Sequence, residues 1–229
     1  SDEHAWFVES RKSKDNKYSD YYIWKDPKAD GSEPNNWGSS FCGSAWEYVP
    51  KLNQYYLHLF DRTQADLNWD NPEVRREMRD IVRFWMEKGV KGFRFDVVNL
   101  ISKGAFNDDD QGDGRRFYTD GPRVHDYLQE LNRETFGRDA DILTVGEMSS
   151  PSMENCFRYA GEDSHELSMV FSFHHLKVDF MGNEKWVLVP ADFGRLKKLL
   201  FSWQEGMAAH RAWNAVFWCN HDQPRVVSR

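Results

Sequence analysis

Three carboxylates in this chain each come at or just after the end of a short apolar run. Asp96, Glu147 and Asp222 end or follow runs that are rich in β-branched and aromatic residues. A buried parallel strand reads as a nearly continuous apolar run, and the C-terminal ends of such strands build the active face of α/β barrels. We therefore expect the three carboxylates to converge. Converging carboxylates of this kind cleave glycosidic bonds.

The elements that must position these carboxylates alternate between helix and strand. Apolar residues recur at helical spacing after start signals near residues 70, 119, 149 and 190. The strand-like runs that follow these helices are residues 91–96, 142–146, 167–173 and 212–218. Four such repeats predict an α/β fold with parallel strands. The count suits half of an eight-stranded barrel or an open doubly wound sheet, although no Gly-rich phosphate loop follows the first strand.

Residues 1–62 have a different character. They contain many aromatic, Lys, Asp, Gly and Pro residues and no long helical pattern. Residues 3–11 predict a short helix, residues 55–60 predict a strand, and residues 46–49 predict its partner. We expect a loop-rich small β domain over residues 1–62, followed by the α/β part over residues 63–229.

The bulk composition excludes several classes of function. The chain has 30 Lys and Arg against 37 Asp and Glu, a net charge of −7, so we expect no nucleic-acid and no membrane partner. No apolar run approaches the ~20 residues of a membrane span, and the N-terminus lacks a signal-peptide pattern. The three cysteines are far apart and match no metal spacing. We expect free thiols, no cofactor and a cytoplasmic location.

Four motifs carry a resemblance to a known family. Residues 92–103, 145–148 and 220–225 resemble, in order, the second, third and fourth conserved regions of the alpha-amylase family of glycoside hydrolases. Residues 64–69, Gln-Ala-Asp-Leu-Asn-Trp, resemble the fifth region in its oligo-1,6-glucosidase-like branch. The resemblance implies that the chain is the central segment of a longer enzyme. Residues 1–62 would be the domain inserted after the third barrel strand, and the rest would be strands four to seven of a partial TIM (β/α)8 barrel.

The resemblance also implies roles for the strand-end residues. Asp96 would be the nucleophile, Glu147 the acid and then the base, and Asp222 the residue that stabilises the oxocarbenium-like transition state. Arg94 shares a strand face with Asp96 and would keep its carboxylate ionised, and His221 would hydrogen-bond the reacting sugar. Each also has a structural explanation, because a strand-end carboxylate can cap a helix and Arg94 can form a structural ion pair.

Within the branch, the chain most resembles the phosphotrehalases, which act on a small phosphorylated disaccharide, trehalose 6-phosphate. Residues 112–122, 146–150 and 173–179 carry this resemblance. A phosphate requires cations at one end of the pocket. We expect Lys177 and Lys185 to bind it, with Arg115 and Arg116 as second choice. The alternative is that these four side chains are solvated surface charges.

Residues 109–120 place oxygens and a Gly at the positions of a calcium loop. Two arginines follow that Gly, and the phosphotrehalase resemblance accounts for the same residues without an ion, so we expect no metal site.

Other functions stay open from the sequence. One is an oligo-1,6-glucosidase, an alpha-glucosidase or a related transglycosylase. Another is a non-catalytic binding subunit, which the presence of all three carboxylates disfavours. We further expect the isolated segment to be inactive, or to self-associate through exposed barrel edges if it folds.

Overall fold

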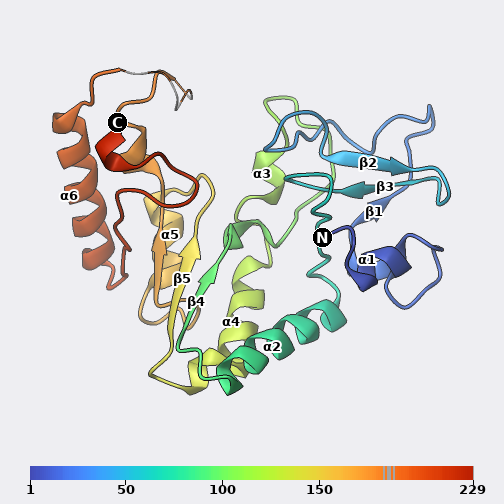
Figure 1. Ribbon diagram of the computed structural model, residues 1–229, viewed down its shortest axis with the longest axis horizontal. Coiled ribbons are helices and arrows are strands. Elements are labelled where there is room, and N and C mark those ends of the chain that lie inside the picture. The colour runs from blue at the N-terminus through green and yellow to red at the C-terminus, as the bar shows by residue number, and fades with distance from the viewer. Residues whose placement is uncertain (183, 185–186, 188, 229) are drawn as a thin grey trace. The chain divides into compact units, whose positions relative to one another are not determined.

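The computed structural model describes residues 1–182, 184, 187 and 189–228. The chain divides into two compact units (Figure 1). The first comprises Ser1–Phe84 and Leu100–Tyr127, and the second comprises Trp85–Asn99 and Leu128–Arg229. The boundary expected at residue 62 remains a prediction.

The first unit contains a three-stranded antiparallel sheet in the order β1-β3-β2. Strand β2 (Trp46–Val49) pairs with β3 (Gln54–Leu57), and β3 also pairs with the short β1 (Trp24–Lys25). The short helix α1 (Ala5–Ser10) precedes the sheet in the chain. The short helix and strand β2 lie where the sequence predicted them, whereas β3 ends at Leu57 rather than at residue 60. The aromatic residues of the strand pair suit a pleated, half-buried surface.

Aromatic side chains form the core of this unit. The cluster comprises Phe7, Tyr21, Tyr22, Val49, Leu52, Tyr56 and Val74. Trp37 lies elsewhere in the unit and is 1% exposed. Gly114 is required beside it, since its φ is +91° and a Cβ there would lie 2.4 Å from the Trp37 ring. Helix α3 (Arg115–Tyr118), which the sequence did not predict, begins directly after this glycine.

A buried ion pair fixes the segment after residue 100 to the segment before helix α2. The Lys103 ammonium lies 2.7 Å from Asp66 Oδ1, with the two side chains 5% and 15% exposed. Lys103 also donates to the carbonyl of Leu100, and Asp66 accepts a bond from the backbone N–H of Leu59. Both charges are therefore compensated away from water.

Helix α2 (Pro72–Glu87) begins as its sequence predicts. Asn71 accepts a hydrogen bond from the backbone N–H of Glu73 at 2.9 Å. Pro72 occupies the first helical position, where a missing N–H costs nothing. Glu73 places a negative charge in the first turn, where the helix dipole favours it.

The second unit contains three parallel strands in the order β4-β5-β6. They are β4 (Gly92–Phe95), β5 (Leu143–Glu147) and β6 (Met169–Phe171). Gly92 pairs with Leu143, Phe95 with Gly146, and Glu147 with Phe171. This confirms an α/β arrangement with parallel strands.

Helices separate these strands in the chain. Helix α4 (Val124–Glu134) precedes β5, α5 (Met153–Ala160) follows it, and α6 (Phe193–Ala209) follows β6. Ser152 caps α5 and Asp192 caps α6, each through its side-chain oxygen. Helix α4 begins at residue 124 rather than near residue 119 as expected, since α3 and a turn occupy the intervening residues.

The strand expected over residues 212–218 was wrong as a continuous element. Only Asn214 forms a parallel bridge, to Val170 of β6, through Val170 N to Trp213 O and Ala215 N to Val170 O. Strand β6 has only three residues, so it offers few backbone groups with which residues 212–218 could pair. The segment nevertheless lies in the sheet order that the prediction requires, next to β6.

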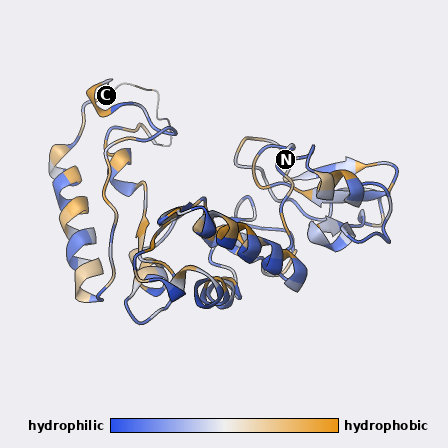
Figure 2. Cartoon of the chain, turned by 60° about the horizontal axis from the view of Figure 1, so that its bottom comes forward, coloured by the Kyte–Doolittle hydropathy of each residue, from blue (hydrophilic) through white to orange (hydrophobic). Residues whose placement is uncertain are grey.

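Apolar side chains remain exposed in the second unit, and orange residues recur along α6 in Figure 2. Phe193 is 73% exposed, Trp213 63% and Phe201 57%. No helix in the described part of the chain is long and apolar enough to cross a membrane. The three cysteines form no disulfide, and Cys156 is buried whereas Cys42 and Cys219 are exposed.

The buried ion pair gives the first prediction. Lys103→Met removes the cation and keeps an apolar stem, which leaves the Asp66 carboxylate buried without its charge partner. We expect the free energy of unfolding to fall by about 3–5 kcal/mol, measured by urea denaturation. The matched control is Lys12→Met, because Lys12 pairs with Glu9 at an exposed site and should change stability little. Equal losses in the two variants would contradict a special role for the buried pair.

Candidate active site

The register of the parallel sheet brings two of the predicted carboxylates together. Phe95, the last residue of β4, pairs with Gly146 of β5. Asp96 follows directly, and Glu147 is the last residue of β5. Both carboxylates therefore lie at the C-terminal edge of adjacent parallel strands, as the sequence predicted for this pair.

One guanidinium bridges these two carboxylates. Arg94 Nη1 donates to Asp96 Oδ1 at 2.7 Å, and Arg94 Nη2 donates to Glu147 Oε2. Arg94 and Asp96 are two residues apart on one strand, so their side chains share a face. Glu147 is almost buried, whereas the Asp96 side chain is 72% exposed. The sequence predicted the contact with Asp96 and missed the contact with Glu147.

The backbone after each carboxylate has a conformation that side chains seldom adopt. Val97 follows Asp96 with φ +35°, and Ser150 follows Glu147 by three residues with φ +49°. A positive φ at a β-branched residue is strained, and strain of this kind concentrates at functional sites. The strand-end turns are thus held by the surrounding structure rather than by local preference.

Asp222 and His221 form a second pair within the same unit. His221 Nε2 lies 3.1 Å from Asp222 Oδ2, with the two side chains 69% and 50% exposed. Asp222 N also donates to Asn220 Oδ1 at 2.9 Å, which tightens the turn that presents both residues. Their roles toward a sugar remain predictions.

The two lysines predicted to bind phosphate follow β6. Lys177 ends a 3-10 turn (His174–Lys177), is exposed, and has no ion pair among the described residues. Burial, together with the positive charges of Lys177 and His175, lowers the pKa of His174 below its usual 6.5. Lys185 lies outside the described residues.

The two arginines offered as second choice are engaged in the first unit. Arg115 pairs with Asp113 at 3.0 Å, and Arg116 pairs with Asp109 and Asp110. These pairs lie inside the loop with the calcium-like spacing and use its carboxylates.

Asp109 is the most constrained carboxylate of that loop. It is 6% exposed and accepts bonds from the N–H groups of Gln111 and Gly114. Burial raises its pKa, but these backbone bonds outweigh burial and hold the pKa below its usual value. No three His, Cys, Asp or Glu side chains in the described ranges gather as a metal site.

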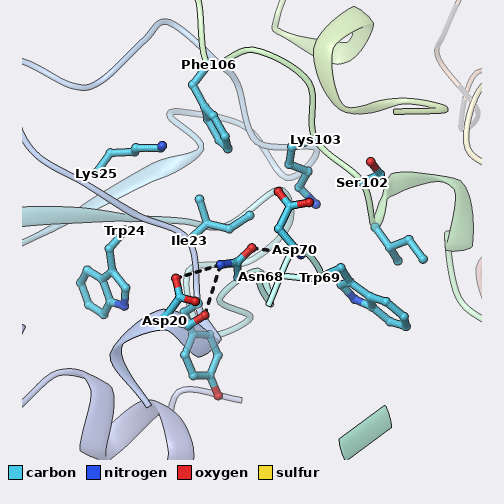
Figure 3. Close-up of a pocket in the computed structure, with 12 residues that line it drawn as sticks. Asp20, Ile23, Trp24, Lys25, Asn68, Trp69, Asp70, Ser102, Lys103 and Phe106 are labelled. Atoms are coloured by element: carbon cyan, nitrogen blue, oxygen red, sulfur yellow. Dashed lines mark hydrogen bonds between the residues drawn. The ribbon is translucent and has the colours of Figure 1, made fainter. Parts of the chain in front are cut away.

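A cavity of about 190 Å³ lies elsewhere, in the first unit (Figure 3). Aromatic residues Trp24, Trp69 and Phe106 line it with polar groups. The polar groups are largely engaged with one another: Asn68 donates to Asp20 at 3.0 Å (Figure 3), and the other pairs are Asp70 with Arg123 and Lys103 with Asp66. None of the described residues in our predicted site lines this cavity.

Asn99 is a residue of this region that sequence reasoning missed. It is fully buried and forms two hydrogen bonds with the backbone of Ser149, two residues after Glu147. The available signal was an Asn within the apolar run Val97–Ile101, since a buried polar side chain requires partners.

Comparisons with known proteins agree with this geometry. The alpha-amylase catalytic domain matches residues 1–229. Trehalose-6-phosphate hydrolase of Bacillus subtilis (strain 168) is 59% identical over 230 residues, covering 100% of this chain and 41% of the relative. Oligo-1,6-glucosidase of Heyndrickxia coagulans is 51% identical over 238 residues, covering 100% of this chain and 42% of the relative.

Solved structures resemble the chain equally well. The crystal structure of Bacillus licheniformis trehalose-6-phosphate hydrolase superposes with a TM-score of 0.97 at 58% identity, covering 100% of this chain and 41% of the other. The chain thus spans about two fifths of the length of these relatives. Its fold is that of the alpha-amylase catalytic domain. The family-wide match, the parallel strands and the paired strand-end carboxylates agree: the chain belongs to the alpha-amylase family of glycoside hydrolases.

Proposed function

We propose that the protein carrying this chain is a retaining glycoside hydrolase that cleaves trehalose 6-phosphate into glucose and glucose 6-phosphate. The observation that carries the chemistry is the single guanidinium of Arg94 shared by Asp96 and Glu147. Two carboxyl groups close together are what a double-displacement mechanism requires. The substrate is proposed from the relatives named trehalose-6-phosphate hydrolase, at 59% and 56% identity.

In the first step, a carboxylate oxygen of Asp96 attacks the anomeric carbon. The bond from that carbon to the bridging oxygen breaks, and Glu147 delivers a proton to the leaving oxygen. Arg94 holds the Asp96 carboxylate in place through their ion pair. Asp222 stabilises the positive charge that develops on the sugar ring.

In the second step, Glu147 takes a proton from water, which attacks the anomeric carbon and releases Asp96.

A (β/α)8 barrel is proposed as the frame that carries these groups. Strands β4, β5, β6 and the Asn214 segment are proposed as the fourth to seventh strands of a (β/α)8 barrel, with residues 1–62 as an inserted domain. The parallel order and the bridge to Val170 support this assignment. Three cysteines that form no disulfide support a cytoplasmic location. The exposed Phe193 and Trp213 support self-association of the isolated segment.

A substrate panel tests the proposed function. We expect the full-length protein to hydrolyse trehalose 6-phosphate with a kcat/KM at least about 100-fold above that for trehalose, because charge-assisted bonds to a phosphate contribute roughly 3 kcal/mol or more in total. Chromatography of glucose and glucose 6-phosphate provides the measurement, with Asp96→Asn as the inactive control.

The second candidate is an oligo-1,6-glucosidase, favoured by the relatives of that name at 49–51% identity. A preference for isomaltose over trehalose 6-phosphate in the same panel would replace the proposal by this candidate. Binding of sugar with no hydrolysis of any substrate would instead indicate a non-catalytic subunit.

Lys177 gives a prediction about phosphate recognition. We expect Lys177→Ala combined with Lys185→Ala to raise KM for trehalose 6-phosphate about 10-fold or more, because the phosphate loses charge-assisted bonds. KM for an unphosphorylated aryl α-glucoside should change less than about twofold. Initial-rate kinetics on both substrates, with Lys12→Ala as an exposed-lysine control, measure the difference. The same rise in KM for both substrates would remove the lysines from the phosphate site.

A further inference from the structure

The buried side chain of Asn99 ties the loop after β4 to the loop after β5. Its Oδ1 accepts a hydrogen bond from Ser149 N at 2.8 Å, and its Nδ2 donates to Ser149 O at 2.9 Å. Asn99 lies three residues after Asp96, and Ser149 lies two residues after Glu147. The Asn99 amide thus bonds both the backbone N–H and the backbone carbonyl of Ser149, two residues after Glu147.

This amide restores strand-like pairing where the sheet has stopped. The ladder between β4 and β5 ends at the pair of Phe95 and Gly146. Asp96 and Glu147 follow this pair. The two segments of the chain are joined again by the hydrogen bonds between Asn99 and Ser149. The two carboxylates therefore lie between a backbone ladder on one side and a side-chain clamp on the other.

The other flank of Glu147 is also fixed. Met148 N donates to Phe171 O of β6 at 3.1 Å. Gly146 leaves room for its neighbours, since a Cβ there would lie 3.1 Å from Val98 Cγ1 and 2.6 Å from Leu167 Cδ1. These contacts restrain the Glu147 backbone on the β6 side. On the β4 side, the hydrogen bonds of Asn99 to Ser149 restrain it.

We propose that Asn99 is a positioning residue that holds Glu147 at the distance from the glycosidic oxygen that proton transfer requires. The inference rests on the proposed function, in which Glu147 is the acid/base. A displacement of about 1 Å costs catalysis heavily. Asn99 forms its bonds beyond Glu147, so its loss should impair protonation of the leaving group more than attack by Asp96.

Leaving groups of different basicity separate this role from a merely structural one. Cleavage of trehalose 6-phosphate expels a sugar hydroxyl, a poor leaving group that requires a proton. Cleavage of α-glucosyl fluoride expels fluoride, which requires far less acid assistance. A positioning role lowers kcat/KM, which reports the first chemical step, for trehalose 6-phosphate alone, whereas general damage lowers kcat/KM for both substrates.

The experiment uses Asn99→Ala in the full-length protein. We expect kcat/KM for trehalose 6-phosphate to fall about 100-fold, the lower end of what general acid catalysis contributes, with kcat/KM for α-glucosyl fluoride within about threefold of wild type, because kcat/KM excludes the hydrolysis of the glycosyl-enzyme that both substrates share. Asn99→Gln keeps an amide donor and acceptor without adding a charge and should restore part of the loss. It also keeps the test available if the alanine variant does not fold, as circular dichroism would reveal.

Asn132→Ala is the matched control. Asn132 also donates a side-chain amide bond to the backbone, to Glu166 O at 2.9 Å. We expect it to lower the melting temperature without changing the ratio of the two rates. Equal losses on both substrates in Asn99→Ala, or no loss on either, would overturn the inference. A wild-type protein that hydrolyses neither substrate would refute the proposed function instead.

Discussion

The site depends on the two ion pairs of Arg94. Glu147 is nearly buried, and a buried carboxylate without a compensating cation is costly. Arg94 supplies that cation and holds Asp96 at the same time, so a single side chain sets the electrostatics of both carboxylates. The fork geometry of a guanidinium allows this, whereas a lysine ammonium would act as a point charge. The parallel register of β4 and β5 brings the side chains of Arg94, Asp96 and Glu147 to one edge of the sheet.

The backbone near the site is arranged around that constraint. Val97 adopts a positive φ immediately after Asp96. A side chain at Gly146 would collide with Leu167 and crowd Val98, so glycine is required there. Asn99 then closes the gap between the two loops. Strain and burial of polar groups are individually unfavourable, and both are concentrated here within a few residues of the two carboxylates.

Much of this fold was accessible from the sequence because its signals are local. Pro72 and the Asn71 cap predict the start of α2, and aromatic alternation predicts β2 and β3. The strand ends at Asp96 and Glu147 are also local signals. The contact between Arg94 and Glu147 is not, because it depends on the register between strands about 50 residues apart. The amide of Asn99 and the shortening of the 212–218 strand to a bridge depend on tertiary pairing in the same way.

The proposed mechanism depends on a covalent bond between Asp96 and the sugar, formed while Arg94 holds Asp96 beside Glu147. Its most direct test is to trap that intermediate in the full-length protein with 5-fluoro-α-glucosyl fluoride, whose slow turnover lets it accumulate, and to sequence the labelled peptide by mass spectrometry. We expect a fluoroglucosyl adduct on Asp96. An adduct on Glu147 or Asp222, or no adduct together with product of inverted anomeric configuration, would contradict it.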